Sequence, residues 1–265
     1  MRTVQYEFLR PHEILEEKRR CSIVYLPLGP LEWHGPAMPY GTDPLLAEAA
    51  AREAALETGG VVMPTLYCGT ERERKPEVLD AMGFEDTSQY VVGMDVPKNT
   101  MKSFYTKEDM FGIIVREYLR MLALQEYKLI VVVNGHGAKG QSSTLERLAV
   151  EFSNETRSQV MVAMPVGMKS PDDPNIGHGT ILETSIQMYL HPENVDLTKL
   201  PDKKEKLKNC DWGIADRATF QLNPNEDKTL RSDPREATYE IGKEYMELSV
   251  QSLIHQVKAK WRELS

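Results

Sequence analysis

Residues 129–137 read LIVVVNGHG, five apolar residues followed by a short polar turn that holds a histidine between two glycines. An apolar run rich in valine and isoleucine predicts a strand that is buried on both faces. Three further segments have the same character: 22–28 (SIVYLPL), 61–67 (VVMPTLY) and 160–166 (VMVAMPV). The sequence therefore predicts four buried strands.

Helical patterns lie between these strands and after the last one. Apolar side chains recur at helical spacing in residues 45–57, 107–125, 143–155 and 234–261. Strands that alternate with helices, and that are apolar throughout, are typical of a mostly parallel sheet covered on both faces. We therefore predict an α/β fold.

Two polar stretches, residues 69–105 and 194–233, interrupt the alternation of strands and helices. Connections of this length are usually lids, oligomer contacts or other insertions. At 265 residues the chain has the length of one large domain. We predict a single domain over residues 1–265 that carries these two long polar insertions.

The composition argues against several classes of protein. Hydrophobic residues make up 41% and charged residues 27%, which is close to the globular average and excludes a disordered or fibrous chain. A net charge of -8 argues against binding to nucleic acid or to an anionic membrane. Three cysteines without a C-x-x-C pair fit a reducing compartment, and no segment resembles a signal peptide or a membrane span. We expect a cytoplasmic protein that binds neither nucleic acid nor a membrane.

The candidate functional residues follow the predicted strands. In open α/β sheets, ligands bind beyond the carboxyl ends of the strands, where loops and helix N-termini converge. The residues placed there are Glu32, His34 and Asp43 after the first strand, His136 after the third, and His178 and Glu183 after the fourth. Imidazole and carboxylate groups on short glycine-containing loops are typical of a metal site.

Each of these residues also has a purely structural interpretation. Asp43 precedes Pro44 and an alanine-rich helix, the pattern of an N-cap. Glu32 and His34 could lie at an exposed strand end, and His136 in an exposed turn. His178 could be an ordinary loop residue, and Glu183 a first-turn helix carboxylate favoured by the helix dipole. Their joint occurrence at one edge of the sheet favours the metal site.

A dinucleotide site is the alternative for the loop after the third strand. Gly135, Gly137 and Gly140 spell G-x-G-x-x-G between a strand and a helix. The fingerprint also requires an acidic residue at the end of the next strand, and none occurs there before Asp172. An oxidoreductase that uses this loop is therefore the less favoured hypothesis.

Taken in order, these motifs resemble the creatininase family of metal-dependent amidohydrolases. The matching segments are G-x-x-E-x-H-G at 29–35, Asp43 nine residues after His34, N-G-H-G at 134–137, H-x-x-x-x-E-T-S at 178–185 and D-P-x-x-A-T-x-x-x-G at 233–242. The resemblance spans about residues 20 to 250. It implies a three-layer α/β/α sandwich around a mostly parallel sheet, and a homo-oligomer, in relatives a hexamer.

The resemblance also implies an active centre with a pair of divalent metal ions, Zn or Mn, with Fe possible. It places Glu32 and His136 on one ion, His34 on the other, and Asp43 between both. Creatininase itself has an aromatic residue and a metal-binding glutamate after the N-G-H histidine, where this chain has Gly137 and Ala138. Glu183 is the candidate substitute ligand, so we expect one or two ions per chain.

The expected reaction is attack of a metal-bound hydroxide on the carbonyl carbon of a small amide, cyclic amide or related carbonyl compound. His178 and Glu183 are the candidate catalytic residues, and His178 would give a proton to the leaving group. No tryptophan occurs in residues 165–174, where creatininase closes over its substrate, so creatinine is not the expected substrate. Other family branches hydrolyse formamides or peptides, or open a cyclic diketone derived from inositol.

Two points stay open: whether the substrate is anionic, and whether the protein is an enzyme at all. The charged segment 71–75 (ERERK), with Lys98 and Lys102, could meet an anionic substrate or could be a solvated surface. A metal-binding scaffold without catalysis is the other alternative to an enzyme.

Overall fold

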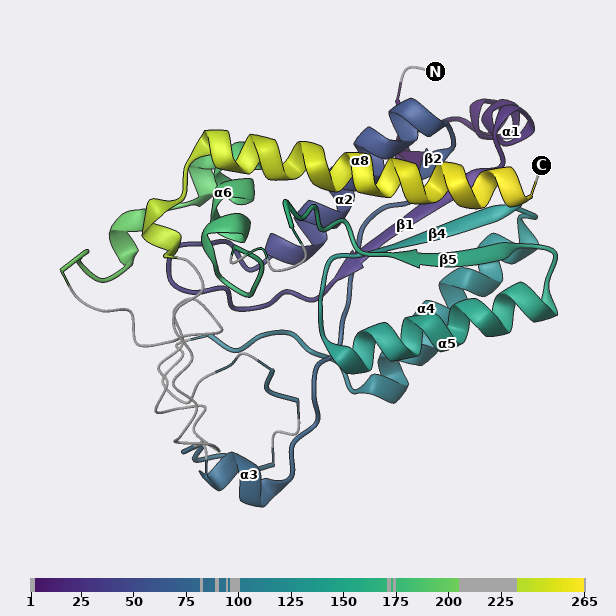
Figure 1. Cartoon of the computed structure of the whole chain (residues 1–265). Coiled ribbons are helices and arrows are strands. Elements are labelled where there is room, and N and C mark those ends of the chain that lie inside the picture. The colour runs from purple at the N-terminus through teal and green to yellow at the C-terminus, as the bar shows by residue number, and fades with distance from the viewer. Residues whose placement is uncertain are drawn as a thin grey trace.

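A computed structural model describes residues 3–81, 83–88, 91–93, 95, 101–170, 173, 175–204 and 233–264. In this part of the chain a five-stranded sheet forms the centre of the fold (Figure 1). The strands are β1 (Ile23–Gly29), β2 (Val61–Val62), β3 (Leu66–Tyr67), β4 (Leu129–Asn134) and β5 (Gln159–Ala163). Their order is β2-β1-β4-β5, and β3 also pairs with β1. Every pair is parallel, which confirms the predicted sheet.

Helices cover both faces of this sheet. The α-helices are α1 (Pro11–Arg20), α2 (Thr42–Thr58), α3 (Pro76–Ala81), α4 (Glu108–Leu124), α5 (Lys139–Glu155), α6 (Ile181–Leu190) and α8 (Tyr239–Glu263). The 3-10 turns are η1 (Tyr6–Phe8), η2 (Pro192–Asn194), η3 (Leu197–Lys199) and η4 (Pro234–Glu236). In Figure 1, α2 and α8 lie above the sheet, and α4 and α5 lie below it.

Successive residues of β1 supply the two hydrophobic cores. Tyr25 belongs to the core under α2, α6 and α8, whereas Leu26 belongs to the core under α4 and α5. All seven residues of β1 are buried. Their side chains alternate between the two faces of the sheet, and each face is covered by a layer of helices. The three-layer α/β/α sandwich is thus confirmed.

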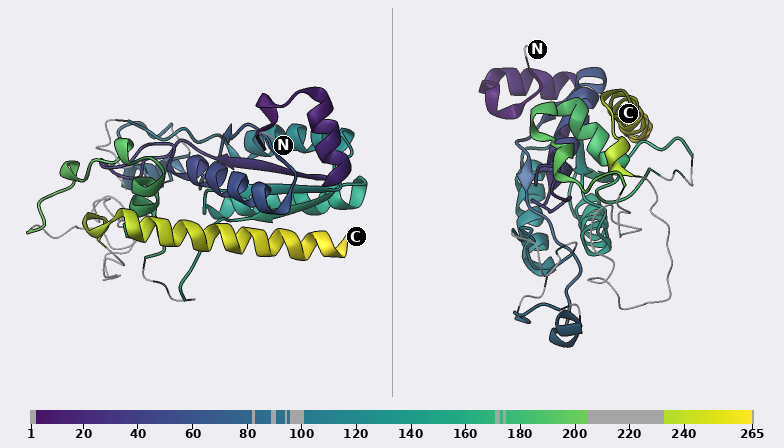
Figure 2. Two further views of the ribbon diagram at one scale, coloured as in Figure 1. Left: turned by 90° about the horizontal axis from the view of Figure 1, so that it is seen from above. Right: turned by 90° about the vertical axis from the view of Figure 1, so that its left-hand side faces the viewer.

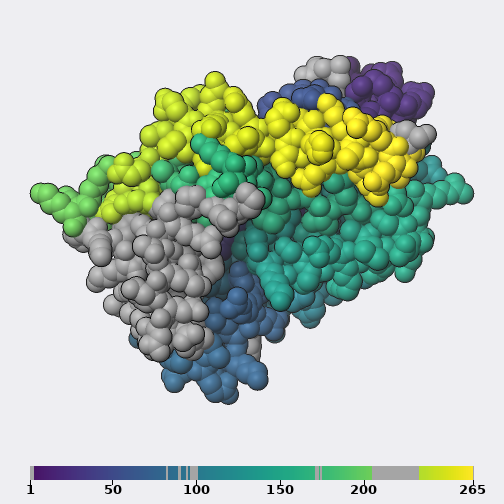
Figure 3. All heavy atoms as spheres, viewed as in Figure 1, coloured from purple at the N-terminus to yellow at the C-terminus, as the bar shows by residue number. Residues whose placement is uncertain are grey.

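The C-terminal helix α8 forms one outer surface of the molecule. It runs along α2 when seen from above (Figure 2), and Figure 3 shows it exposed along its length. Its N-terminus is capped by Thr238, whose Oγ1 accepts a hydrogen bond from the Ile241 backbone N–H. The predicted helix 234–261 is therefore divided, because η4 precedes this cap. No helix in the described ranges has both the length and the apolar character that a membrane crossing requires.

The register of β1 and β4 brings their carboxyl ends together. Leu28 lies opposite Asn134, so the loops that follow β1 and β4 leave the sheet side by side. The predicted strand 61–67 is instead divided into β2 and β3. Tyr25 pairs with Val62 and Leu28 with Leu66, so this segment has one more residue than β1 between the two pairs. The extra residue makes a bulge around Pro64, which has no N–H to donate.

The first polar insertion folds back onto the loop after β1. Phe104 makes an antiparallel bridge with Leu31, and Glu73 makes one with Val91. Ser103 Oγ accepts a 2.9 Å hydrogen bond from the Trp33 backbone N–H. Lys98, and residues 205–232 of the second insertion, lie outside the described residues.

Candidate metal centre

The carboxyl ends of β1 and β4 meet the start of α2, and glycine makes this approach possible. A Cβ atom at Gly135 would lie 2.2 Å from the backbone oxygen of Asp43. Only a glycine fits such a contact. The close approach places Asp43 beside His136, although the two residues are far apart in the sequence.

All six residues predicted from the strand ends lie in one cluster. Three overlapping groups have candidate ligand atoms within 4.8 Å of one another: Glu32, Asp43 and His136; His34, Asp43 and Glu183; and Glu32, His34 and His178. Asp43 belongs to two of these groups. The geometry therefore joins loops from three distant parts of the chain.

The two carboxylate oxygens of Asp43 face different histidines. His136 Nδ1 lies 2.9 Å from Asp43 Oδ2, and also 2.9 Å from Glu32 Oε2. On the other side, His34 Nε2 lies 3.0 Å from Asp43 Oδ1 and 3.8 Å from Glu183 Oε2. Asp43 is consequently placed where a bridging carboxylate would lie.

The N-cap interpretation of Asp43 is wrong. Helix α2 is capped at Gly41, and Asp43 lies inside its first turn, with no side-chain hydrogen bond capping the helix. The Asp43 carboxylate faces His34 and His136 instead.

The centre is buried and its charges compensate one another. Burial opposes charge on the His34 imidazole, but the carboxylates of Asp43, Glu183 and Glu32 raise its pKa to about 10. Burial also opposes ionisation of Asp43, yet His34 and His136 hold its pKa far below the ordinary value. Burial likewise opposes charge on His136, but Glu32 and Asp43 raise its pKa well above the ordinary value, so two imidazolium groups lie among the buried carboxylates. Such an arrangement is a poor means of stabilising a fold, and is typical of a functional site.

The donor atoms of this centre suit a divalent metal ion. Among the described residues, His136 Nε2 is buried without a hydrogen-bond partner, and Glu32 Oε2 and His34 Nε2 make no hydrogen bond of good geometry despite their close contacts with His136 and Asp43. Buried polar atoms are rarely left unpaired unless a ligand satisfies them. Imidazole nitrogens and carboxylate oxygens are ligands that zinc and manganese accept.

Further hydrogen bonds hold the candidate ligands in place, and the sequence did not point to all of them. The Tyr105 hydroxyl donates to Glu32 Oε1 at 2.6 Å. Asn134 Nδ2 donates to the His136 backbone oxygen at 2.9 Å, and Gln141 Nε2 donates to Asn134 Oδ1 at 2.7 Å. Residues that orient metal ligands in this way contribute strongly to metal affinity. Tyr105 and Gln141 had no recognisable signal in the sequence.

His178 belongs to the cluster as a neutral imidazole. Its Nε2–H donates to the Trp33 backbone oxygen at 2.8 Å, which leaves Nδ1 3.8 Å from Glu32 Oε1. Burial and the neighbouring His34 lower the pKa of His178 to about 4, against the opposing carboxylates. The two histidine rings lie 4.2 Å apart between centroids.

Glu183 has both a structural contact and a place in the cluster. It lies in the first turn of α6, and its Oε2 accepts a 2.5 Å hydrogen bond from the Gly179 backbone N–H. Burial raises the pKa of Glu183 to about 7, although His34 opposes this shift. The first-turn interpretation and the ligand interpretation are therefore compatible.

A cavity of about 410 Å³ opens beside this cluster. Its polar wall includes Glu32, Asp43, His136, His178 and Glu183, and its apolar wall includes Met164, Pro165, Ile176 and Leu182. A volume of this size is typical of sites for small molecules.

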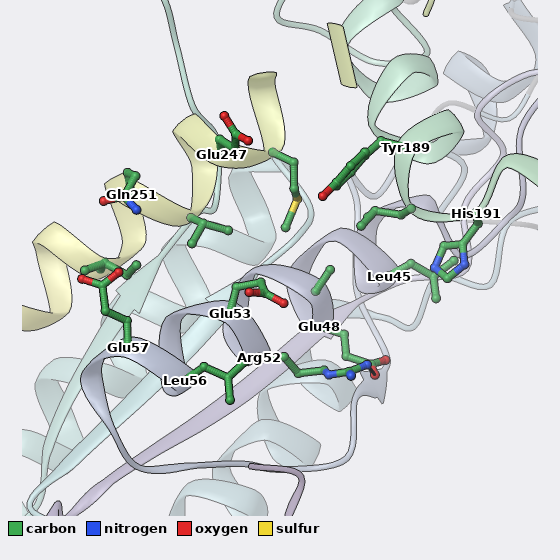
Figure 4. A pocket seen from close by; sticks show the side chains of 15 residues that line it. Leu45, Glu48, Arg52, Glu53, Leu56, Glu57, Tyr189, His191, Glu247 and Gln251 are labelled. Atoms are coloured by element: carbon green, nitrogen blue, oxygen red, sulfur yellow. Dashed lines mark ion pairs between the residues drawn. The ribbon is translucent and has the colours of Figure 1, made fainter. Parts of the chain in front are cut away.

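A larger groove of about 730 Å³ lies elsewhere, between α2, the end of α6 and α8 (Figure 4). Its walls carry Arg52 and Glu48, which form an ion pair with 3.8 Å between their charged atoms. None of the clustered histidines and carboxylates lines this groove. It is therefore separate from the candidate metal centre.

The glycine-rich loop after β4 packs against its own chain. The backbone of Asp43 approaches Gly135 too closely for any residue with a Cβ atom, and the loop contributes His136 to the cluster. This contact explains Gly135 without a bound pyrophosphate, and it removes the main support for the dinucleotide hypothesis.

Comparisons with known proteins agree with this geometry. The family model described as creatininase (creatinine amidohydrolase) matches residues 7–257. A creatinine amidohydrolase of Pseudomonas putida is 25% identical over 198 residues, which cover 68% of each chain. A 3-dehydro-scyllo-inosose hydrolase of Thermotoga maritima is 32% identical over 66 residues, or 25% of this chain and 21% of that protein.

Solved structures of creatininases have the same fold. A manganese form of creatininase is 21% identical with a TM-score of 0.70, and covers 98% of this chain and 99% of its own. A mutant creatininase of the Zn-Zn type is 21% identical with a TM-score of 0.69 and the same coverage. Because the family model spans nearly the whole sequence, this chain belongs to the creatininase family of hydrolases.

Proposed function

We propose that the chain is a metal-dependent hydrolase that acts on the carbonyl carbon of a small amide, cyclic amide or related carbonyl compound. The observation that carries this proposal is the pair of ligand groups that share Asp43. The amidohydrolase activity named for the Pseudomonas putida relative supports the reaction class. The zinc and manganese forms of similar structures support zinc or manganese as the metal.

Two ions would be held by different sets of side chains. Glu32, Asp43 and His136 would hold the first ion. His34, Asp43 and Glu183 would hold the second. Ala138 has no ligand atom, so Glu183 would provide the second carboxylate of that site. When bound, the metal pair would activate a water molecule and polarise the carbonyl group.

His178 would move the proton in this reaction. Its Nε2–H is fixed by the Trp33 backbone oxygen, so Nδ1 is the atom able to accept a proton. A neutral imidazole can take the proton of the attacking water, and Glu32 Oε1, 3.8 Å away, would stabilise the resulting charge. His178 would then give this proton to the leaving group. Glu183 would assist catalysis as a metal ligand, because the hydrogen bond from the Gly179 backbone N–H holds its carboxylate in the cluster.

Opening of a cyclic diketone is the second candidate reaction. It is supported by the 66-residue match to a hydrolase of 3-dehydro-scyllo-inosose. The same activated water would attack one carbonyl carbon of the diketone and form a carboxylic acid there. The C–C bond to the carbon beside the second carbonyl group would break, that carbonyl group would take the electron pair as an enolate, and His178 would give the leaving carbon its proton.

The experiment removes metal with a chelator, restores zinc or manganese, and measures product masses with a panel of formamides, cyclic amides including creatinine, and cyclic ketones. We expect one or two ions per chain and metal-dependent hydrolysis of at least one compound class. Asp43→Asn is expected to lose both metal and activity. Full activity in metal-free wild-type protein would contradict the proposal.

The organisation of the chain and its assembly stay predictions. We propose a single domain over residues 1–265, a cytoplasmic location and a homo-oligomer, with a hexamer expected from the family resemblance. Light scattering on the purified protein measures the subunit number directly, and a monomer would contradict the assembly prediction.

A further inference from the structure

We propose that the substrate carries a carboxylate or phosphate group and that Arg74 binds this oxyanion at the wall of the cavity. The inference rests on the proposed function, because Arg74 lines the same cavity as His136 and His178. It adds a substrate class, namely a small carbonyl compound with an anionic end.

Arg74 is held at the cavity with unsatisfied hydrogen-bonding capacity. The adjacent residue Glu73 is anchored by its bridge to Val91. Among the described residues, Arg74 forms no ion pair, and its Nε is buried without a hydrogen-bond partner. A guanidinium group has five N–H donors, and an unpaired buried donor is unfavourable. A ligand in the cavity would satisfy it.

The charge of Arg74 is also poorly compensated. Burial and the neighbouring Arg72 both lower the pKa of Arg74, and only Glu71 opposes them. The Glu71 carboxylate already has other contacts. Its Oε1 accepts a 2.6 Å hydrogen bond from the Arg72 backbone N–H, and its Oε2 lies 3.8 Å from His136 Nε2. The Glu71 carboxylate is therefore already engaged by a backbone N–H and lies near His136, so it compensates the charge of Arg74 only in part.

The cavity wall outside the metal centre is positively charged. Arg72, Arg74 and Lys139 line it with one carboxylate, Glu71, so three cations face one anion. The remaining acidic residues of the cavity are the candidate ligands Glu32, Asp43 and Glu183, whose carboxylates face the rings of His34 and His136 and would face the metal ions in the loaded protein. A positive wall in a partly enclosed cavity attracts anionic ligands.

The chemistry of the guanidinium group defines the class of ligand. Its planar fork binds carboxylate and phosphate oxygens through two parallel hydrogen bonds. The apolar side chains of Met164, Ile176 and Leu182 would contact the carbon skeleton between the oxyanion and the reacting carbonyl. The segment 71–75, which could also have been a solvated surface, thus contributes Arg72 and Arg74 to the cavity.

The test uses three probes that share one formamide group. They are N-formylglycine with a carboxylate, N-formylethanolamine phosphate with a phosphate, and neutral N-formylethanolamine. Calorimetric titration of zinc-loaded wild-type protein measures Kd, and product analysis measures kcat/KM. We expect at least one charged probe to bind roughly 10- to 100-fold more tightly than the neutral one, the usual contribution of a charge-assisted hydrogen bond. The charged probe that shows the larger gain over the neutral probe identifies whether the site prefers a carboxylate or a phosphate.

Arg74→Met should remove the advantage of the charged probe and leave the neutral probe unchanged. Arg74→Lys should restore part of the advantage, because it keeps a point charge without the planar fork. Lys75→Met is the matched control, since Lys75 is an exposed cation in the same segment that does not line the cavity.

Several results would overturn the inference. One is equal binding of the charged and neutral probes, and another is the absence of saturable binding of either charged probe. A third is an equal loss of affinity for all three probes in Arg74→Met. Hydrolysis of all three probes at equal rates would leave the hydrolase proposal intact and refute the oxyanion site. Arg74-dependent binding of a charged probe without hydrolysis of any probe would support the oxyanion site and count against the hydrolase.

Discussion

The hydroxyl group of Tyr105 donates a 2.6 Å hydrogen bond to Oε1 of Glu32. The other carboxylate oxygen, Oε2, lies 2.9 Å from His136 Nδ1. One oxygen of Glu32 is therefore held by the protein while the other faces the candidate metal position. Tyr105 follows Phe104, whose bridge to Leu31 ties the end of the first insertion to the loop after β1. The insertion thus positions a residue of the centre.

Tyr105→Phe is expected to weaken metal binding by about 10- to 100-fold, because it frees Glu32 to rotate away from the cluster. Competition between the protein and a zinc-chelating dye measures the affinity. Tyr40→Phe is the matched control, since its hydroxyl donates to the Met101 backbone oxygen, away from the cluster. Equal zinc affinities of Tyr105→Phe and wild type would show that this hydrogen bond does not orient a ligand.

Glu183→Gln tests the second ion. We expect this variant to retain one ion and to lose the other, because Glu32, Asp43 and His136 form a ligand group without Glu183. Metal content per chain is measured by mass spectrometry after dialysis. Glu193→Gln, at an exposed position after α6, is the control and should keep the wild-type content. Two ions retained in Glu183→Gln would mean that another group holds the second site.

His178→Ala separates proton transfer from ligation. We expect metal content to remain and kcat to fall by about 10²- to 10⁴-fold, the usual contribution of a proton-transfer group. His191→Ala, in the separate groove between α2 and α8, should leave kcat unchanged. If His178→Ala lost metal in parallel with activity, His178 would be a ligand instead.

Asp95 makes stability depend on pH in the metal-free protein. Burial raises the pKa of Asp95 from its ordinary value of 3.8 to about 6, against the hydrogen bonds from Ser103. Between these values the folded state binds the proton more tightly than the unfolded state, so the free energy of unfolding falls as pH rises from about 4 to about 6. Asp95→Asn should lack this contribution, and denaturant titrations across the range measure it. A constant difference between variant and wild type would disprove the assignment.

The sheet and its site-bearing loops could be predicted because their signals are local. Strands β1 and β4 are continuous apolar runs, and each was predicted to within one residue at either end. Since parallel strands end at one edge, Glu32, His34 and His136 could be placed together before the structure was known. The division of residues 61–67 depends on how Pro64 disrupts pairing with β1, and the helix α1 was not predicted.

The contribution of the first insertion could not be predicted. Tyr105 and Arg74 have no periodic pattern or motif around them. Their positions depend on the bridges from Phe104 to Leu31 and from Glu73 to Val91, which join residues far apart in the sequence. Whether a charged segment is solvated or lines a cavity is likewise decided by tertiary packing, so the sequence left both possibilities open for residues 71–75.

The most direct test of the metal centre is anomalous diffraction at the zinc absorption edge from crystals grown with zinc. We predict one peak within about 2.0–2.2 Å of ligand atoms of Glu32, Asp43 and His136. A second peak should lie beside His34, Asp43 and Glu183. Zinc-containing crystals in which no anomalous peak contacts Asp43 would contradict the account.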